Sequence, residues 1–174
     1  PPPPRPPARR RAAGAPRAVQ NSYSLLARQD EPDLLPLCAE RGVAYLAFGP
    51  LAGGWLTGKY RRGAAYPAGS RMTQRPEPYQ DLVTGATFDA LDRLEAIAGS
   101  RGTSLAGLAL GWLLADERVT QVVIGPGRPE HLAPAAEALR YPVTEAERSD
   151  IEAAVAGLSG RARSQEARSQ EAGQ

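Results

Sequence analysis

The amino-acid sequence predicts an α/β protein built on a parallel sheet. Three short apolar runs, which end near Gln20, Phe48 and Ile124, are separated by segments with helical periodicity. The first two runs flank a single helix, an order typical of a right-handed parallel strand–helix–strand unit. Because three parallel strands leave both sheet edges and one face open, the sequence predicts part of a larger barrel or sheet.

The overall composition excludes several classes of protein. The chain has 174 residues, enough for one domain with a core, and its net charge of +2 argues against a nucleic-acid partner. The single cysteine, Cys38, excludes an internal disulfide and favours a cytoplasmic setting. No apolar run approaches the roughly 20 residues of a membrane helix. We therefore expect no membrane partner, and we assign no metal site.

Both ends of the chain have compositions typical of disordered segments. Residues 1–17 consist largely of Pro, Arg, Ala and Gly, and residues 159–174 contain Arg-Ser-Gln-Glu-Ala twice. The first segment could alternatively serve as a Pro-rich ligand for an aromatic groove or as a basic arm. These boundaries leave residues 18–158 as the folded part. Because the chain begins at Pro1 and its only methionine is Met72, we expect a fragment or a trimmed product.

The first half of the folded part predicts two strands around one helix. Val19 and Gln20 end a short strand, and the polar residues after them are expected to form a loop. Acidic residues and a proline at 30–32 predict a helix start, and Gly42 predicts its end. A second strand spans 43–48 and runs into a glycine-rich loop, which is typical of the rim of a ligand site.

The second half predicts a long irregular segment, 53–87, followed by helices and one strand. Thr87 is expected to cap a helix that Gly102 ends, and Ser104 to cap a second, buried helix. A strand over 119–124 runs into Gly125-Pro126-Gly127 and a helix that starts at 128, a junction suited to anions. Thr144 opens a capping box and a last helix that ends near 158.

Four stretches of the sequence, in order, resemble the C-terminal half of aldo-keto reductases, in the branch that includes bacterial reductases and potassium-channel β subunits. These stretches are QNSYSLL (20–26), LAFGPLAGGWLTGKY (46–60), ALGWLL (109–114) and VIGPGRPEHL (123–132). The resemblance implies a partial (β/α)8 TIM barrel, corresponding to strands six to eight and the C-terminal helices. It also implies NADPH as the cofactor and a small-molecule carbonyl compound as the substrate of the full-length proteins.

The resemblance assigns cofactor-binding roles by position. Gln20 would contact the nicotinamide carboxamide, and Phe48 would stack on the nicotinamide ring. The loop after it would lie along the pyrophosphate, and two cations further on would reach the phosphates. A last segment would hold the adenosine 2′-phosphate. These three groups are, in turn, Gly49, Pro50, Leu51 and Gly53; Lys59 and Arg71; and Gly125, Gly127, Arg128 and His131.

The chain departs from the family pattern at several positions. Gly49 replaces a usual serine, Gly127 a small polar residue, His131 a common glutamine, and Ala135 a frequent asparagine. Each change removes a side-chain hydrogen bond of about 1 kcal/mol, which leaves the choice between NADPH and NADH open.

The family's catalytic set of Asp, Tyr, Lys and His cannot be drawn from this chain. Its only lysine, Lys59, and its only histidine, His131, match cofactor-side positions, so we assign no catalytic residue. The sequence therefore predicts the cofactor-binding half of an aldo-keto reductase that is inactive alone. The alternative is a truncated, non-enzymatic fragment, with the Pro/Arg-rich arm as a binding module. The open barrel edges offer a route to self-association.

Overall fold

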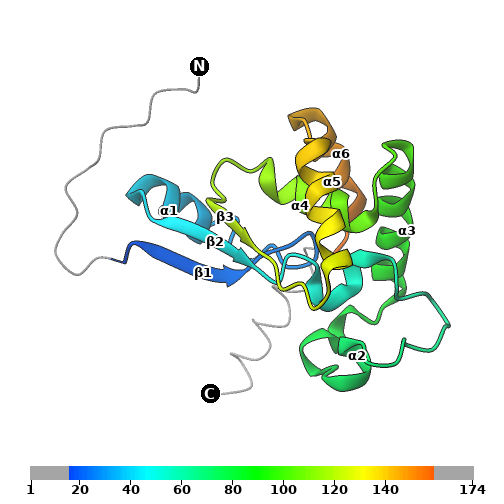
Figure 1. The fold of residues 1–174 in the computed structure, drawn as a ribbon. Helices are drawn as coiled ribbons and strands as arrows, with labels where there is room; N and C mark the ends of the chain where they lie inside the picture. The colour runs from blue at the N-terminus through cyan, green and yellow to red at the C-terminus, as the bar shows by residue number, and fades with distance from the viewer. Residues whose placement is uncertain (1–15, 159–174) are drawn as a thin grey trace.

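The computed structural model describes residues 16–158, which form three strands and a set of helices of very different lengths (Figure 1). The strands are β1 (Ala18–Ser22), β2 (Ala44–Phe48) and β3 (Gln121–Val123). The α-helices are α1 (Leu34–Arg41), α2 (Arg71–Gln74), α3 (Gly85–Ser100), α4 (Leu105–Leu114), α5 (Ala133–Arg140) and α6 (Glu145–Val155). Three 3₁₀ helices are η1 (Ala52–Thr57), η2 (Glu77–Leu82) and η3 (Pro129–Leu132).

The sheet is parallel in the order β1-β2-β3, as the sequence predicts. Its register aligns Ser22 with Phe48, and Phe48 with Val123, so the carboxyl ends of the three strands meet in one row. The first strand continues through Asn21 and Ser22, residues expected to lie in a loop. Among the described residues, β1 and β3 each pair only with β2, so both outer edges of the sheet are open.

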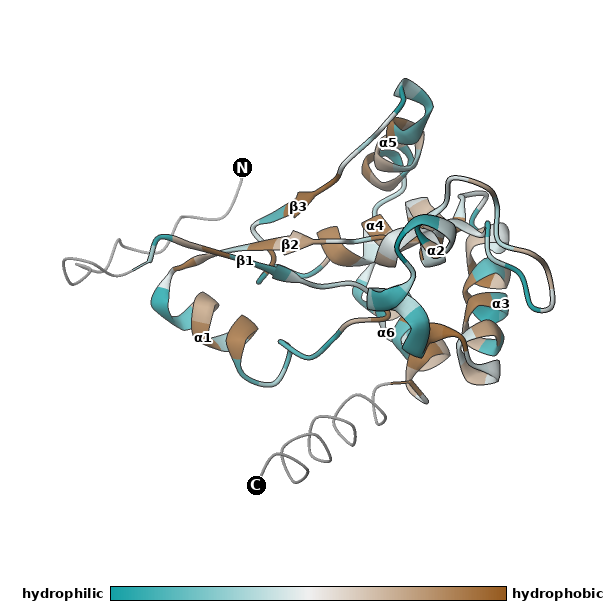
Figure 2. Cartoon of the chain, turned by 90° about the horizontal axis from the view of Figure 1, so that it is seen from below, coloured by the Kyte–Doolittle hydropathy of each residue, from teal (hydrophilic) through white to brown (hydrophobic). Residues whose placement is uncertain are grey.

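One face of the sheet is covered and the other is open. Tyr45 and Ala47 point to the covered face and are fully buried, whereas their neighbours Leu46 and Phe48 point to the other face. Helix α1 packs against β2, and α4 packs against β3. In Figure 2 the three strands carry α1 on one side, while no described helix covers the opposite side. This open sheet confirms the α/β class and its parallel, incomplete character.

Local sequence signals set most helix ends. Gly42 adopts a left-handed conformation after α1, and the Ser104 side chain accepts the backbone N–H of Gly107 at the start of α4. Thr144 and Glu147 form both hydrogen bonds of a capping box. The expectation that Thr87 caps α3 is wrong. Thr84 is the cap, and the buried Thr87 donates its N–H to the Thr84 hydroxyl oxygen at 3.1 Å.

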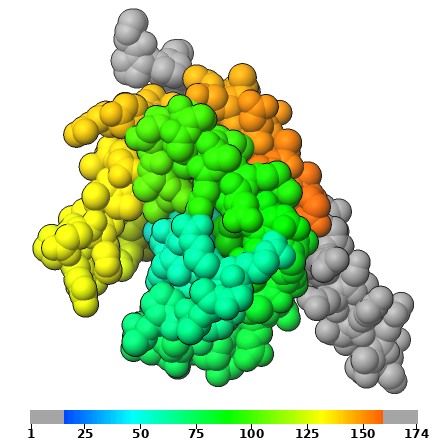
Figure 3. All heavy atoms as spheres, turned by 90° about the vertical axis from the view of Figure 1, so that its right-hand side faces the viewer, coloured from blue at the N-terminus to red at the C-terminus, as the bar shows by residue number. Residues whose placement is uncertain are grey.

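The segment 53–87 contains three short helices, where the sequence predicted irregular structure. Trp55 in η1 is fully buried and contacts the rings of Tyr60 and Phe88. These aromatic contacts attach η1 to α3. Figure 3 shows the segment around 55–80 beside α3 on one face, while residues around η3 form a separate projection. The predictions made for residues 1–15 and 159–174 lie outside the described residues.

A buried network of charged and polar side chains joins β1 to α4 and α6 beneath the sheet. The Tyr23 hydroxyl donates to Glu31 at 2.8 Å, and Arg148 donates to Asp116 at 3.0 Å and to the carbonyl of Trp112 at 2.8 Å. Asp116 is 5 % exposed, and it also accepts two hydrogen bonds from the Arg118 side chain. Each of these buried charges has a hydrogen-bonded partner, so removing one member would leave another buried and unpaired.

Candidate functional site

Phe48 ends β2 with its ring exposed on the open face of the sheet. Its exposed fraction is 54 %, although its own strand neighbours Tyr45 and Ala47 are fully buried. The alternation of the strand forces this arrangement, because successive side chains point to opposite faces. A structural core role for Phe48 within the described residues is therefore excluded. A flat aromatic surface is left free at the row where the strands end.

The loop after Phe48 presents two free backbone N–H groups. Gly49 has a φ of +64°, which turns the chain sharply away from the strand direction. Within residues 16–158 the N–H groups of Gly49 and Leu51 donate no hydrogen bond, and Pro50 between them has no N–H to donate. Two unpaired donors beside an exposed ring suit an anionic group that carries a flat heterocycle.

Further along the loop, two glycines lie directly under other side chains. A Cβ atom at Gly53 would lie 2.4 Å from Cζ of Tyr79, and one at Gly54 would lie 2.4 Å from Nζ of Lys59. The Tyr79 ring therefore covers the loop at Gly53. The Lys59 ammonium lies back over Gly54 and sits 5.1 Å from the centre of the Tyr60 ring.

The predicted phosphate-binding cations are exposed and have no acidic partner in the described part of the chain. Lys59, Arg71 and Arg128 form no ion pair within residues 16–158. By contrast, Arg61 and Arg62 in the neighbouring segment pair with Glu95 and Asp89. The three unpaired cations keep their charge available for an external anion.

The segment 125–131 closes on itself through a histidine. The backbone N–H of Gly127 donates to Nδ1 of His131 at 3.3 Å, so the proton of a neutral His131 is on Nε2. Both residues, together with Gly125 and Arg128, are exposed. Gln20 is also exposed and lies on the open face two residues before Ser22. None of these five residues lines the pocket that lies beside Phe48.

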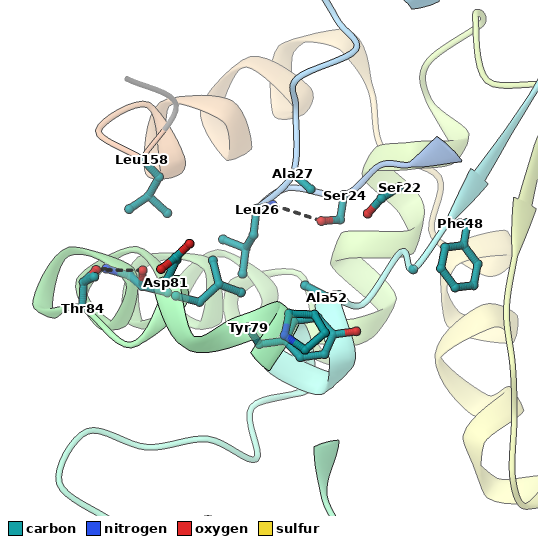
Figure 4. A pocket seen from close by; sticks show the side chains of 14 residues that line it. Ser22, Ser24, Leu26, Ala27, Phe48, Ala52, Tyr79, Asp81, Thr84 and Leu158 are labelled. Atoms are coloured by element: carbon teal, nitrogen blue, oxygen red, sulfur yellow. Dashed lines mark hydrogen bonds between the residues drawn. The ribbon is translucent and has the colours of Figure 1, made fainter. Parts of the chain in front are cut away.

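A pocket of about 270 Å³ opens beside Phe48 (Figure 4). It lies between the ends of β1 and β2, the segments η1 and η2, the start of α3 and Leu158. Of the predicted site residues, Phe48 and Gly49 line it. Its remaining lining residues are Ser22, Ser24, Leu26, Ala27, Ala52, Pro78, Tyr79, Asp81, Leu82, Thr84, Thr87 and Leu158. No sequence pattern marks these residues, because they come from segments far apart in the chain.

Three tyrosines lie near the strands or line the pocket, namely Tyr23, Tyr45 and Tyr79. Burial, together with a hydrogen bond to a carboxylate, raises the pKa of both Tyr23 and Tyr45, which bond Glu31 and Asp30. Tyr79 lines the pocket, but neither a lysine nor a histidine lines it with this residue. No group of three potential metal ligands occurs in the described part of the chain, and no helix there is long and apolar enough to cross a membrane.

Comparison with known proteins relates the sequence of this chain to a family. The family described as Aldo/keto reductase family matches residues 8–156. L-glyceraldehyde 3-phosphate reductase of Escherichia coli K12 is 43% identical over 125 residues, covering 69% of this chain and 36% of that protein. A probable voltage-gated potassium channel subunit beta of Arabidopsis thaliana is 35% identical over 118 residues, covering 65% of this chain and 35% of that protein.

A solved structure shows the same fold. The glycerol dehydrogenase AKR11B4 from Gluconobacter oxydans superposes with a TM-score of 0.67 at 24% identity, covering 81% of this chain and 42% of the other. The chain thus spans little more than a third of the length of the curated relatives and matches part of an aldo-keto reductase barrel. Because the family match extends over most of its length, the chain belongs to the aldo/keto reductase family as a partial domain.

Proposed function

We propose that this chain is the cofactor-side, C-terminal half of an NADPH-dependent aldo-keto reductase. The observation that carries the proposal is the exposed Phe48 ring beside the unpaired N–H groups of Gly49 and Leu51. Membership of a family that uses a nicotinamide cofactor supports it. In the complete barrel the reaction is reduction of a carbonyl compound to an alcohol, for which bound NADPH supplies the hydride.

Each residue group has a distinct role in this proposal. Phe48 stacks on the nicotinamide ring, and Gln20, which stands on the same face, bonds its carboxamide. The loop from Gly49 to Gly53 lies along the pyrophosphate, and the unpaired Lys59 and Arg71 neutralise its charge. The segment 125–131, with Arg128 as its cation, holds the 2′-phosphate.

The residues present fit such a group, apart from one contact. The open backbone at Gly125, where an added Cβ would meet nothing within 4 Å, leaves room for a phosphate. At Gly127, however, the N–H is already bonded to His131. Binding of a 2′-phosphate through that N–H therefore requires His131 to turn away. In this proposal the preference for NADPH over NADH rests on Arg128. Relatives differ in this preference, since one from Escherichia coli K12 is named NADH-specific methylglyoxal reductase.

The chain alone is proposed to be inactive. Reduction of a carbonyl requires a general acid near the hydride acceptor. The hydroxyls of the buried Tyr23 and Tyr45 bond carboxylates on the covered side of the sheet, away from Phe48. Lys59 and His131, the only residues of their types in the chain, stand at the proposed phosphate positions. In this proposal the general acid comes from the rest of a complete barrel.

Titration of the purified chain with NADPH and with NADH, followed by nicotinamide fluorescence, tests the binding role. Phe48→Ala should weaken NADPH binding about tenfold, because the stacking surface is lost. Leu37→Ala is the matched control, since Leu37 is 45 % exposed on α1 and lies outside the proposed site. Equal weakening by both variants would refute a stacking role for Phe48. Turnover of an aldehyde by the chain alone would refute the proposed inactivity.

A further inference from the structure

His131 is the only histidine of the chain, and its ring bonds the backbone of the segment 125–131. The Nδ1 atom accepts the N–H of Gly127 at 3.3 Å, and the backbone N–H of His131 donates to the carbonyl of Arg128 at 3.1 Å. Within residues 16–158 the His131 side chain forms no ion pair. The imidazole therefore acts here as a hydrogen-bond acceptor, a role that only its neutral form can fill.

The backbone N–H groups on either side of this contact are free. In the described part of the chain the N–H groups of Gly125 and Arg128 donate no hydrogen bond, and Pro126 has no N–H to donate. The four residues from 125 to 128 are all exposed, and those around η3 form a projection (Figure 3). Of the three N–H groups, that of Gly127 is the one that a side chain of the protein already occupies.

Protonation of His131 removes this acceptor and adds a positive charge. In the imidazolium form both ring nitrogens donate, so an Nδ1–H group would face the N–H of Gly127, and two donors that face each other repel. The ring then turns away and the Gly127 N–H is released. Histidine is the side chain whose charge ordinarily changes between about pH 5 and 8. A change of pH in this range therefore gives the segment three free N–H groups and a second cation beside Arg128.

The charged groups around His131 do not duplicate this response. Among the described elements, α5 makes the main contact with η3, and it carries Glu137 and Arg140. Glu137 accepts the backbone N–H and the hydroxyl at the start of α4, at 2.8 and 2.6 Å, and Arg140 is the last residue of α5. The sequence neighbours Arg128 and Glu130 form no ion pair within residues 16–158. Carboxyl groups ordinarily titrate near pH 4 and guanidinium groups above about pH 12, outside the range of the imidazole.

From these observations we infer that the protonation of His131 tunes the preference of this chain for NADPH over NADH. The inference deepens the proposed function and rests on it for placing the 2′-phosphate at the segment 125–131. Neutral His131 keeps the Gly127 N–H bonded, so the preference then rests on Arg128 alone. Protonated His131 releases that N–H to a phosphate oxygen and adds a positive charge. NADPH is therefore favoured most strongly in mild acid, whereas NADH, which lacks the 2′-phosphate, gains nothing from the change.

Adenosine 2′-phosphate and adenosine are the probes, because the difference between them isolates the 2′-phosphate from the rest of the cofactor. Amide shifts of the ¹⁵N-labelled full chain give the dissociation constant of each probe at about pH 5.5 and about pH 7.5. The ratio of the two constants is the phosphate preference. Its increase from the higher to the lower pH should be about tenfold greater in the original chain than in His131→Gln. This comparison cancels the titration of the phosphate itself.

Equal increases in the original chain and in His131→Gln would overturn the inference, as would the absence of saturable binding of adenosine 2′-phosphate at both pH values. Without any probe, the Gly127 amide shift should titrate between about pH 5 and 8 in the original chain and not in the variant. Because the probes lack nicotinamide, failure of intact NADPH to bind would refute the proposed function without altering this result. If NADPH binds but the phosphate preference does not respond to pH, the inference alone fails.

Two further substitutions separate the released N–H from the added charge. His131→Ala frees the Gly127 N–H at every pH, so it should raise the phosphate preference at about pH 7.5 above that of the original chain. An unchanged preference would overturn the inference. Glu130→Gln is the control, since Glu130 is exposed and the variant gains one positive charge without releasing the N–H. It should raise the preference equally at both pH values. Loss of the pH response in this variant would assign that response to Glu130 and overturn the inference.

Discussion

The backbone N–H of Tyr23 donates a hydrogen bond to the carbonyl oxygen of Phe48 at 3.0 Å. This bond joins an exposed aromatic residue to a fully buried one, because the Tyr23 ring lies in the core against Tyr45 and Trp112. The position of the Phe48 backbone at the strand ends therefore depends on packing beneath the sheet. Exposure of the Phe48 side chain does not imply a mobile backbone.

Tyr23→Phe should lower the free energy of unfolding by about 1 kcal/mol, because the hydroxyl loses its hydrogen bond to Glu31. The loss remains modest because Glu31 still accepts a hydrogen bond from Arg28 at 2.7 Å. Urea unfolding measures the difference. Tyr141→Phe serves as the control, since Tyr141 is 44 % exposed and its hydroxyl bonds no described residue, so it should leave stability unchanged.

Gly53→Ala should destabilise the chain more than Gly63→Ala does. Both glycines have φ values near +70°, at +64° and +71°, so an alanine introduces similar backbone strain of about 1 kcal/mol at either position. An added Cβ at Gly63 meets nothing within 4 Å, whereas at Gly53 it collides with the Tyr79 ring. We expect an additional loss of about 1 kcal/mol or more at Gly53. Equal losses in urea unfolding would show that Tyr79 moves aside freely.

Asp116→Asn should lower the free energy of unfolding at neutral pH by about 2 kcal/mol, because Arg148 and Arg118 lose a charged acceptor. Burial alone would raise the pKa of Asp116, but hydrogen bonds from Arg118 and the charge of Arg148 outweigh burial and hold that pKa below its ordinary value. Asp89→Asn is the control, since the exposed Asp89–Arg62 pair should contribute less than 1 kcal/mol.

The contribution of Asp116 to the free energy of unfolding should also decrease in acid. Because folding depresses its pKa, the stabilisation is present above the unfolded-state pKa of about 4 and is lost as pH falls through the lower folded-state value. The gap in stability between the original chain and Asp116→Asn should therefore narrow below about pH 4. A gap that stays constant in acid would contradict a charge-based role for this carboxyl.

At alkaline pH the buried tyrosines should destabilise the fold. Burial and the hydrogen bond to Asp30 raise the pKa of Tyr45, so the folded state retains a proton that the unfolded state releases. The contribution of Tyr45 to the free energy of unfolding is fully present below the unfolded-state pKa of about 10, and it falls as pH rises above that value. Tyr45→Phe should flatten this decline. Phenolate absorbance recorded beside a circular dichroism titration would show Tyr45 ionising only with unfolding.

Local chemistry made much of the fold predictable. Gly42, Ser104 and Thr144 each mark a helix end through backbone freedom or a side-chain cap, and these signals act within a few residues. The cap of α3 was predicted at Thr87 instead of Thr84 because the first turn of the helix, at Gly85 and Ala86, has no large apolar side chain. The helical periodicity therefore becomes visible only after the helix has begun.

The candidate site was predictable only where one continuous stretch carries it. A strand that ends in Phe48 and runs into glycines is such a stretch. The pocket is different, because Ser22, Asp81 and Leu158 converge from distant parts of the chain and no periodicity connects them. Ser22 was predicted to lie in a loop and not in β1, because its neighbours in the sequence are polar. Its place opposite Phe48 depends on strand pairing, which the sequence of β1 alone does not specify.

The pairing of β2 with β3 bears on the order in which the chain folds. The N–H of Tyr45 bonds the Thr120 hydroxyl across 75 residues of sequence, whereas β1, α1 and β2 follow one another directly. Closing the longer loop costs more chain entropy, so contacts of β1 with β2 should form first and those of β3 last. Amide hydrogens of β3 should accordingly exchange faster than those of β2. The row of Ser22, Phe48 and Val123 would then be completed only at the end of folding.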